Sequence, residues 1–391
     1  MKINKYKITA VLFLVIIFWI GTVTLWNNRT EFKNMLHSGD IINETNKIYS
    51  ENVAYSDTFI DMWSKTQSVT DVQLLDDAEY GNIIKDEKGN LYFPANDVDV
   101  TSLAQNTIDF SEMLSEKNIK FAYVQAPNKD LKGYTDKIVS DYNFSNKNAD
   151  EFLSILNENG VDTLDLRELI IKENLDREKL FYKTDHHWTT PTAFWAYNKL
   201  VEYLNQKYNL NIDPNNYYRD INNYNLTEIK ECYLGSLGRR VGKSVSGLDD
   251  YTFIEPNFKT DYKIYNGVTS KTNPIFKGNF HEAIVKDNIL TSNDVTSNKH
   301  ATYFEWDYGD LIIKNTLIDN DVKILLIKDS YSLPLAAFLS TCVNELDMVD
   351  LRDTPKVDLQ KKIADGDFDV VLVLYNTEVF NETMFGFDNK W

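Results

Sequence analysis

The chain has 391 residues, of which 43% are hydrophobic and 13% aromatic, so it can bury a large core and is not a disordered protein. Its formal net charge of −18 argues against a nucleic-acid partner, because phosphate binding needs basic stripes. Cys232 and Cys342 are the only cysteines, which excludes a disulfide-rich scaffold and a four-thiolate metal site. The sequence leaves open whether these two pair.

An uncharged apolar run covers residues 8–26 and is long enough to span a bilayer as a helix. Three lysines precede it, so the positive-inside rule predicts that residues 1–7 are cytoplasmic and the rest of the chain extracytoplasmic. A cleaved signal peptide is the alternative, but its apolar core is usually about 7–15 residues and a small-residue cleavage site follows it. Trp26-Asn27-Asn28-Arg29 follows here. We therefore predict an uncleaved single-pass anchor in the cell membrane.

The polar segment 27–75 has weak helical spacing, and we interpret it as an extracytoplasmic, partly helical stalk. The globular domain is predicted to cover residues 76–391. A hairpin over residues 82–93, turning at Gly89-Asn90, is expected near its start.

Helix and strand patterns then alternate, which predicts parallel strand pairing. Helices are expected over residues 101–118, 149–159, after Ser332 and around 357–364, and strands over residues 120–125, 161–166, 323–328, 346–351 and 369–375. The predicted fold class is α/β, a three-layer domain around a mostly parallel sheet. Residues 208–310 are less regular and are expected to form an insert of short strands and long loops that provides a substrate-facing wall.

Two distant segments supply an acid, a base and a nucleophile. Asp185-His186-His187-Trp188 is one of them, and Ser330, directly after the apolar run 324–327 and Lys328-Asp329, is the centre of the other. A serine there can lie at the carboxyl end of a buried strand, where α/β sheets bind their ligands. If the chain is extended at Asp185, its side chain and that of His187 share one face, and His186 points to the other.

Each segment also has a purely structural interpretation. Ser330 could cap the helix that follows it, Asp185 could cap a turn, and His187 could be a satisfied core histidine. Adjacent histidines beside an acid also raise the possibility of zinc, but the spacings typical of a third ligand are absent, including at His300. We predict neither a metal site nor a cofactor.

Residues 181–189, Phe-Tyr-Lys-Thr-Asp-His-His-Trp-Thr, are similar to the Thr-Asp-x-His-Trp segment of the SGNH-hydrolase-like domain of alginate O-acetyltransferases of the AlgX/AlgJ type. The Asp-His-His-Trp motif resembles that of the bacterial DHHW family, which shares that fold. Further matches lie at 326–331, 349–352 and 371–376, and the resemblance covers roughly residues 80–391.

The resemblance implies Ser330 as nucleophile, His187 as base and Asp185 as the residue that orients the base. The order Asp, His, Ser is that of the acetyltransferase branch, whereas in ordinary SGNH esterases the serine comes first. One departure is Lys328, which stands where the usual motif has glycine before Asp-Ser.

Other site residues are predicted more loosely. The Ser330 amide is expected to be the first oxyanion donor, with Gly235 or Asn376 supplying a second. Arg239 and Arg240 are expected to bind sugar hydroxyls or carboxylates. Aromatic side chains that could stack on a sugar are Trp188, Tyr331, Tyr134 and Tyr375.

The combined hypothesis is a membrane-anchored, extracytoplasmic O-acetyltransferase that acts on a polysaccharide through a Ser-His-Asp triad. The resemblance implies a membrane-bound O-acyltransferase as the acetyl donor partner. Three alternatives stay open: an esterase that removes acetyl groups with the same triad, a non-catalytic scaffold or sugar-binding subunit of an export complex, and acyl transfer in teichoic acid D-alanylation.

Overall fold

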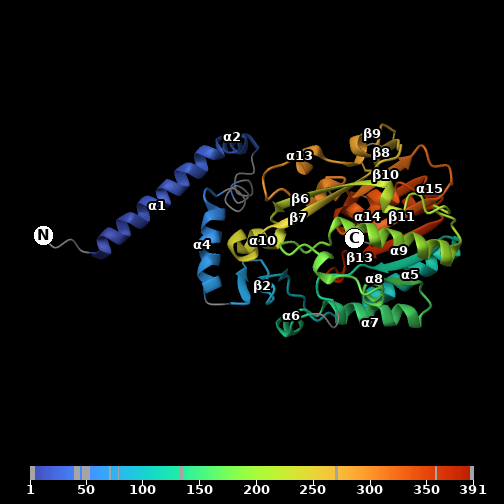
Figure 1. The fold of residues 1–391 in the computed structure, drawn as a ribbon, viewed down its shortest axis with the longest axis horizontal. Helices are drawn as coiled ribbons and strands as arrows, with labels where there is room; N and C mark the ends of the chain where they lie inside the picture. The colour runs from blue at the N-terminus through green and yellow to red at the C-terminus, as the bar shows by residue number, and fades with distance from the viewer. Residues whose placement is uncertain are drawn as a thin grey trace. The chain divides into compact units, whose positions relative to one another are not determined.

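The computed structural model describes residues 5–38, 45, 53–69, 72–77, 79–131, 135–268, 272–305, 307–356 and 359–387. The chain divides into two compact units, residues 1–72 and residues 73–391. Figure 1 shows the helices and strands of both.

The first unit contains the described helices α1 (Lys5–Asn27), α2 (Arg29–Ser38) and α4 (Ser56–Val69). Among the described residues, only Tyr6–Asn27 forms a helix that is long and apolar enough to cross a membrane, a property that a signal sequence shares. Its apolar side chains are largely exposed, as an anchor or a signal sequence requires. The helices α2 and α4 fall in the predicted stalk, of which residues 39–44, 46–52 and 70–71 lie outside the described part.

The second unit is built on an eight-stranded sheet with the order β5-β4-β13-β11-β12-β10-β8-β9. The first five strands in this order are parallel, as predicted. They are β5 (Thr163–Asp165), β4 (Lys120–Gln125), β13 (Val370–Tyr375), β11 (Lys323–Lys328) and β12 (Glu345–Val349). The prediction from helix and strand alternation is therefore confirmed.

Helices cover both faces of this sheet, which makes the predicted three layers (Figure 1). Successive residues of β13 alternate between two cores: Leu372 and Leu374 pack on one side, and Val371 and Val373 on the other. The first core also includes residues of α8 (Leu166–Lys172), α9 (Thr190–Tyr208) and α14 (Ser332–Leu339), and the second includes residues of α5 (Thr101–Glu116), α7 (Ser145–Glu158) and α15 (Leu359–Gly366).

The predicted insert, residues 208–310, also contributes strands to the central sheet. Two of its strands, β8 (Tyr262–Asn266) and β9 (Phe276–Gly278), extend the central sheet through the antiparallel strand β10 (Asp310–Asn315). The sheet is therefore mixed. β6 (Tyr224–Tyr233) and β7 (Asp249–Pro256) form a separate antiparallel pair. The insert also contains the short helices α10 (Ser236–Val241), α11 (Lys243–Ser246), α12 (Phe280–Ile284), which packs against β7, and α13 (Asp287–Leu290).

The predicted hairpin near residue 82 is present. It pairs β2 (Gly81–Lys85) with β3 (Leu91–Tyr92), and Gly89 has a φ of 83° in the connecting turn, a conformation that favours glycine. A third strand, β1 (Leu74–Asp77), completes a small sheet, and the short helix α6 (Lys137–Tyr142) packs near β2. Both cysteines are free thiols.

A buried cluster of one lysine and two carboxylates joins α15 to two interior strands of the sheet. Lys362, only 7% exposed, lies 2.7 Å from Asp310 of β10 and 2.5 Å from Asp347 of β12. Burial alone would lower the pKa of Lys362, but the two carboxylates outweigh it and the pKa is raised.

Lys362→Met is expected to lower the free energy of unfolding by about 3–5 kcal/mol, because it leaves two buried carboxylates without their cation. Thermal or urea unfolding of the full chain in detergent measures the change. The neighbouring Lys361→Met is the matched control, since Lys361 and its partner Asp365 are both more than 60% exposed; it should change stability by no more than about 0.5 kcal/mol. Equal effects of the two substitutions would contradict the prediction.

Candidate active site

The site lies where parallel strands β11 and β13 reach their carboxyl ends. The Asp329 carboxylate joins the two ends: it accepts hydrogen bonds from the Tyr331 N–H (2.9 Å), the Asn376 N–H (2.7 Å) and Asn376 Nδ2 (2.8 Å). Burial raises the pKa of Asp329 to about 6 despite these bonds. The turn that carries Ser330 is thus anchored to the neighbouring strand.

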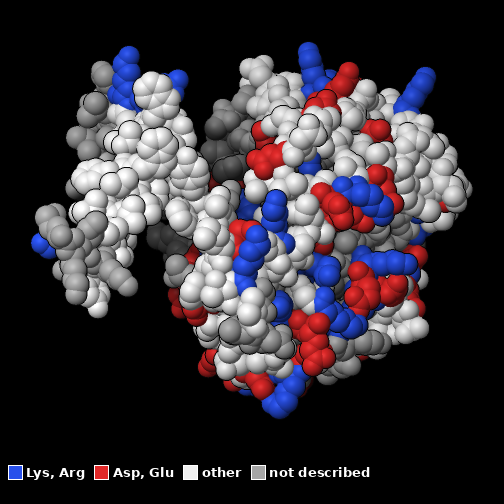
Figure 2. All heavy atoms as spheres, turned by 60° about the vertical axis from the view of Figure 1, so that its left-hand side comes forward, with Lys and Arg blue, Asp and Glu red and all other residues white. Residues whose placement is uncertain are grey.

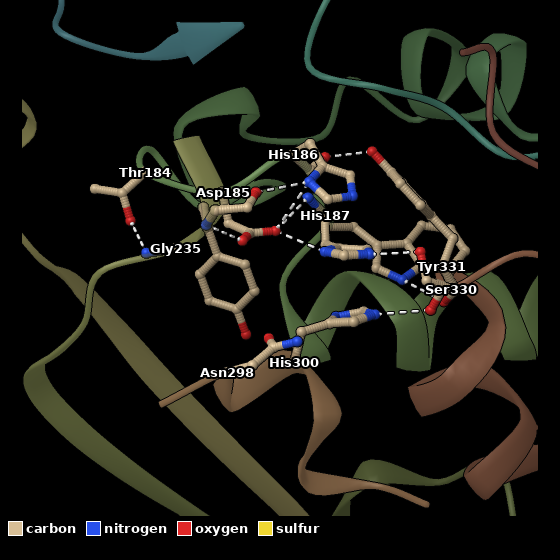
Figure 3. A network of polar contacts seen from close by, with 12 residues as sticks. Thr184, Asp185, His186, His187, Gly235, Asn298, His300, Ser330 and Tyr331 are labelled. Carbon is tan, nitrogen blue, oxygen red and sulfur yellow. Dashed lines mark hydrogen bonds and ion pairs between the residues drawn. The ribbon is translucent and has the colours of Figure 1, made fainter. Parts of the chain in front are cut away.

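Ser330, His187 and Asp185 form a continuous chain of hydrogen bonds (Figure 3). His187 Nε2 lies 2.8 Å from Ser330 Oγ, and His187 Nδ1 lies 2.6 Å from Asp185 Oδ1. This is the geometry in which an imidazole can take the proton of a serine hydroxyl while a carboxylate orients the ring.

The Asp185 carboxylate is held from several sides. Besides the ring, Oδ1 accepts the His187 N–H (3.0 Å), and Oδ2 accepts the Tyr233 hydroxyl (2.8 Å) and the Ser236 N–H (2.7 Å). Burial would raise the pKa of Asp185, but the neighbouring histidines and these bonds outweigh it and hold the pKa well below its usual range. Asp185 is therefore a carboxylate, and Tyr233 and Ser236 are partners that sequence reasoning missed.

Both histidines of the motif face the cleft, and the expectation that they point to opposite sides is wrong. The chain bends at residues 183–187 instead of running extended, because the Asp185 side chain accepts the amide two residues on. The ring of His186 lies 3.8 Å from that of His187, and its Nδ1 lies 2.9 Å from Ser236 Oγ.

His300 is a third histidine at the site, and its spacing in the sequence gave no signal. Its ring stacks on His187 with centroids 3.6 Å apart and planes 12° apart. Its Nε2 lies 2.8 Å from the carbonyl oxygen of Ser330, the geometry of an N–H donor bond. His300 thus contacts both the ring of His187 and the turn that carries Ser330.

Burial has the largest effect on the pKa of His187. Burial, followed by the adjacent His186 and His300, lowers the pKa of His187 well below its ordinary value, although Asp185 opposes the shift. The pKa of His186 is lowered to about 4, again chiefly by burial. Both rings are neutral near pH 7, which is the state a general base needs.

Both predicted second oxyanion donors already have hydrogen-bond partners. The Gly235 N–H donates to Thr184 Oγ1 (2.7 Å), so the expectation is wrong for this amide. The backbone N–H of Asn376 and one N–H of its side-chain amide donate to Asp329, and a side-chain amide has a second N–H, so the role of Asn376 stays a prediction. The Ser330 N–H donates to no described residue.

The aromatic side chains expected to stack on a sugar are buried instead. Trp188, Tyr331 and Tyr375 are fully buried. Trp188 Nε1 donates to the Tyr331 carbonyl (3.0 Å), and the Tyr331 hydroxyl donates to the His186 carbonyl. Trp188 and Tyr331 therefore connect the two motifs and do not bind substrate, while Tyr134 lies outside the described residues.

The two arginines differ in position. Arg239 is exposed and does not line the cleft, whereas Arg240 lines it. The Arg240 guanidinium is paired with Asp77 (3.2 Å) and Glu79 (2.5 Å). The expectation that Arg239 binds the sugar is wrong, because Arg239 does not line the cleft. That Arg240 binds sugar hydroxyls or carboxylates stays a prediction, and its guanidinium already has two carboxylate partners.

Lys328 occupies the position of the usual glycine without blocking the serine. Its side chain is fully buried, and Nζ binds Asp307 (2.5 Å) and Asp350 (3.0 Å). The two carboxylates give the charge a partner beneath the site, so the backbone before Ser330 keeps its place.

The triad opens into a cleft of about 970 Å³. Hairpin residues Tyr80 and Phe93 line it with ring centroids 4.3 Å apart, and Phe93 also contacts His186. Sequence reasoning did not identify this aromatic pair.

Asp185, His186 and His187 are also the one described group of potential metal ligands, with ligand atoms within 4.8 Å of one another. The side chains of these three residues also make the hydrogen bonds to Ser330, Tyr233 and Ser236. The bonding pattern fits a proton relay.

Residues 92–225 match the family model of the SGNH hydrolase-like domain of the acetyltransferase AlgX. The second unit has the SGNH hydrolase-like fold. The segment includes the Asp-His-His-Trp motif, and the match supports acetyltransferase activity for this domain.

Solved structures share this fold. Bacillus cereus PatB1 with a sulfonyl adduct is 21% identical with a TM-score of 0.63, covering 78% of this chain and 98% of that one. A DHHW family protein from Eubacterium siraeum is 17% identical with a TM-score of 0.61, covering 81% of this chain and 98% of that one. At these identities the likeness shows the fold, and it confirms the predicted three-layer domain. Among curated proteins, none matches the chain.

Gly235→Ala is expected to reduce activity about 100-fold, because an added Cβ would lie 2.6 Å from Asp185 Oδ2 and 2.8 Å from its Cα and would displace the triad acid. The rate of acetyl-ester consumption measures it. Ser236→Ala is the control in the same turn: it keeps the backbone donor to Asp185 and should lose less than about 10-fold. Full activity of Gly235→Ala would contradict the arrangement.

Proposed function

We propose that this protein is a membrane-anchored, extracytoplasmic O-acetyltransferase that moves acetyl groups onto polysaccharide hydroxyls. The observation that carries the proposal is the hydrogen-bonded chain Ser330–His187–Asp185 at the wall of a large cleft. The match to an acetyltransferase domain supports the choice of acyl group.

In the first half-reaction, His187 Nε2 takes the proton of Ser330 Oγ as the oxygen attacks the donor's acetyl carbonyl. The Ser330 N–H stabilises the oxyanion of the tetrahedral intermediate. The intermediate expels the donor's alcohol, which receives its proton from His187, and leaves an acetyl ester on Ser330.

In the second half-reaction, a sugar hydroxyl in the cleft gives its proton to His187 and attacks the acetyl-serine. The intermediate collapses to the acetylated sugar, and His187 returns the proton to Ser330. Water in place of the sugar would make the same protein an esterase, so the acceptor decides between the two activities.

His300 acts here as a positioning residue. Its stack on His187 and its bond to the Ser330 carbonyl support a role in keeping the base and the nucleophile in register. The buried ring is neutral, because burial lowers the pKa of His300, and it therefore adds no charge that would oppose formation of the imidazolium.

The apolar helix Tyr6–Asn27 supports the anchored topology, with the domain outside the membrane. The acetyl donor we propose is a membrane-bound O-acyltransferase that exports acetyl groups from the cytoplasm. A soluble activated ester can replace it in an assay.

Ser330→Ala should lower acetyl transfer at least about 1,000-fold, because it removes the nucleophile. The assay uses the full chain in detergent, 4-nitrophenyl acetate as donor, added oligosaccharides and mass spectrometry of both sugar and protein. Ser332→Ala is the matched control, since Ser332 is two residues away, buried, and its hydroxyl has no partner among the described residues. It should retain transfer within about threefold.

The assay also separates the alternatives. Loss of donor that needs Ser330 but leaves the sugar unmodified favours the esterase. No turnover and no label on Ser330 from a sulfonyl fluoride, the kind of probe that the PatB1 adduct suggests, would favour a scaffold.

Activity is expected to fall on the acid side of its pH profile (the acid limb) with a midpoint below pH 6.5, the ordinary pKa of imidazole. The buried His187 has a lowered pKa, and protonation of this base stops the reaction. Initial rates of donor consumption from pH 4 to 9, corrected with Ser330→Ala, measure it. Glu378, whose pKa burial raises to about 7, also lines the cleft, so Glu378→Gln is the control that assigns the limb. A limb above pH 7 that persists in Glu378→Gln would contradict the lowered pKa.

A further inference from the structure

The charge of the cleft bears on which polysaccharide it can accept. Resting on the proposed function, we propose that the acceptor is a polymer of neutral or amino sugars, and that the cleft rejects polymers rich in uronic acids such as alginate. The distribution of cations and carboxylates around Ser330 carries this inference.

Both arginines that line the cleft are already paired. Arg240 binds Asp77 and Glu79 and lies over the Tyr80 ring at 4.8 Å. Two carboxylates thus face one guanidinium. A sugar carboxylate would have to displace one of them to reach this cation.

Arg352, the second arginine, belongs to a balanced cluster. It binds Asp350 (2.6 Å) and Asp307 (3.2 Å), and the same two carboxylates hold the buried Lys328. The positive charges of Arg352 and Lys328 equal the negative charges of Asp307 and Asp350. This cluster offers no net positive charge to an incoming anion.

Further carboxylates line the cleft without an ion pair to any described lysine or arginine. Glu305 and Asp353 are exposed at the cleft, and the backbone of Glu305 is held by its N–H bond to the Ala301 carbonyl (3.1 Å). Glu378 is a third acid in the lining, partly ionised near pH 7.

The three histidines of the cleft do not offset these acids. Burial lowers the pKa of His186, His187 and His300, so all three are neutral at pH 7. The lining is therefore net negative. On the wider surface that Figure 2 shows, basic and acidic side chains are intermixed.

What remains for recognition suits an uncharged sugar. Tyr80 is 41% exposed and lies beside Phe93, which provides an apolar face near the triad. Asn96, Asn298 and Asn381 also line the cleft. A hexose or a protonated amino sugar can use these groups without bringing like charges together.

A matched pair of acceptors tests the charge directly. Oligomers of β-1,4-linked mannose and of β-1,4-linked mannuronate differ only in a hydroxymethyl or carboxylate group at each ring. With the full chain in detergent and 4-nitrophenyl acetate, acetyl transfer to the mannose oligomer should exceed transfer to mannuronate at least about tenfold at low salt. The ratio should fall when salt is raised to about 0.5 M, because screening weakens the repulsion.

The double variant Glu305→Gln/Asp353→Asn should lower the ratio of acetyl transfer to the mannose oligomer over transfer to the mannuronate oligomer at low salt. Glu112→Gln/Glu116→Gln removes the same charge from exposed positions of α5, which does not line the cleft, and should leave the ratio unchanged. Equal or better transfer to mannuronate, or an unaltered ratio in the Glu305/Asp353 variant, overturns the charge inference.

Binding of both oligomers to Ser330→Ala protein provides a readout that needs no turnover. If the Ser330→Ala protein binds the mannose oligomer preferentially but the wild type transfers no acetyl group, the proposed activity is contradicted and the charge selectivity is supported. If the wild type acetylates both oligomers equally, the activity is supported and the charge selectivity is contradicted. The two failures are thus distinguishable.

Discussion

The Asp185 carboxylate is the group on which the site depends. It is buried and charged, a state that is costly unless hydrogen bonds replace water. Its partners come from three places in the chain: His187 beside it, Tyr233 at the end of β6, and the Ser236 amide at the start of α10. Satisfying one carboxylate therefore brings the insert against the triad motif, and Gly235 is required because no larger residue fits against Asp185.

Ser330, the proposed nucleophile, is positioned by a second buried carboxylate. Asp329 connects the turn after β11 to the end of β13, so the location of Ser330 follows from the parallel pairing of these strands. Trp188 and Tyr331 then join the two motifs through hydrogen bonds that involve no substrate. The two motifs thus contain residues that hold the segments together, Trp188 and Tyr331, beside the residues for which we propose a chemical role.

Burial has opposite consequences for the two kinds of ionisable group at this site. It favours the neutral form of the histidines, which prepares His187 to accept a proton. It also makes an unpaired charge on Lys328 costly, and this lysine binds Asp307 and Asp350, the two carboxylates that the partly exposed Arg352 binds as well. The cations near the cleft are consequently neutralised, and the exposed acids determine its charge.

The sequence by itself determined the α/β class, the parallel strands and the triad candidates, because apolar runs, turn residues and the Asp-His-His-Trp motif are local signals. It also identified the apolar N-terminal segment as a candidate span. Only the tertiary structure decided that β8 and β9 extend the central sheet, that His300 stacks on His187, and that the Gly235 N–H is already bonded to Thr184. It likewise decided that Arg240 is paired and that Trp188 is buried. These outcomes depend on which groups, far apart in the sequence, form hydrogen bonds and ion pairs with one another in the folded chain. The spacing of residues along the sequence does not identify such partners.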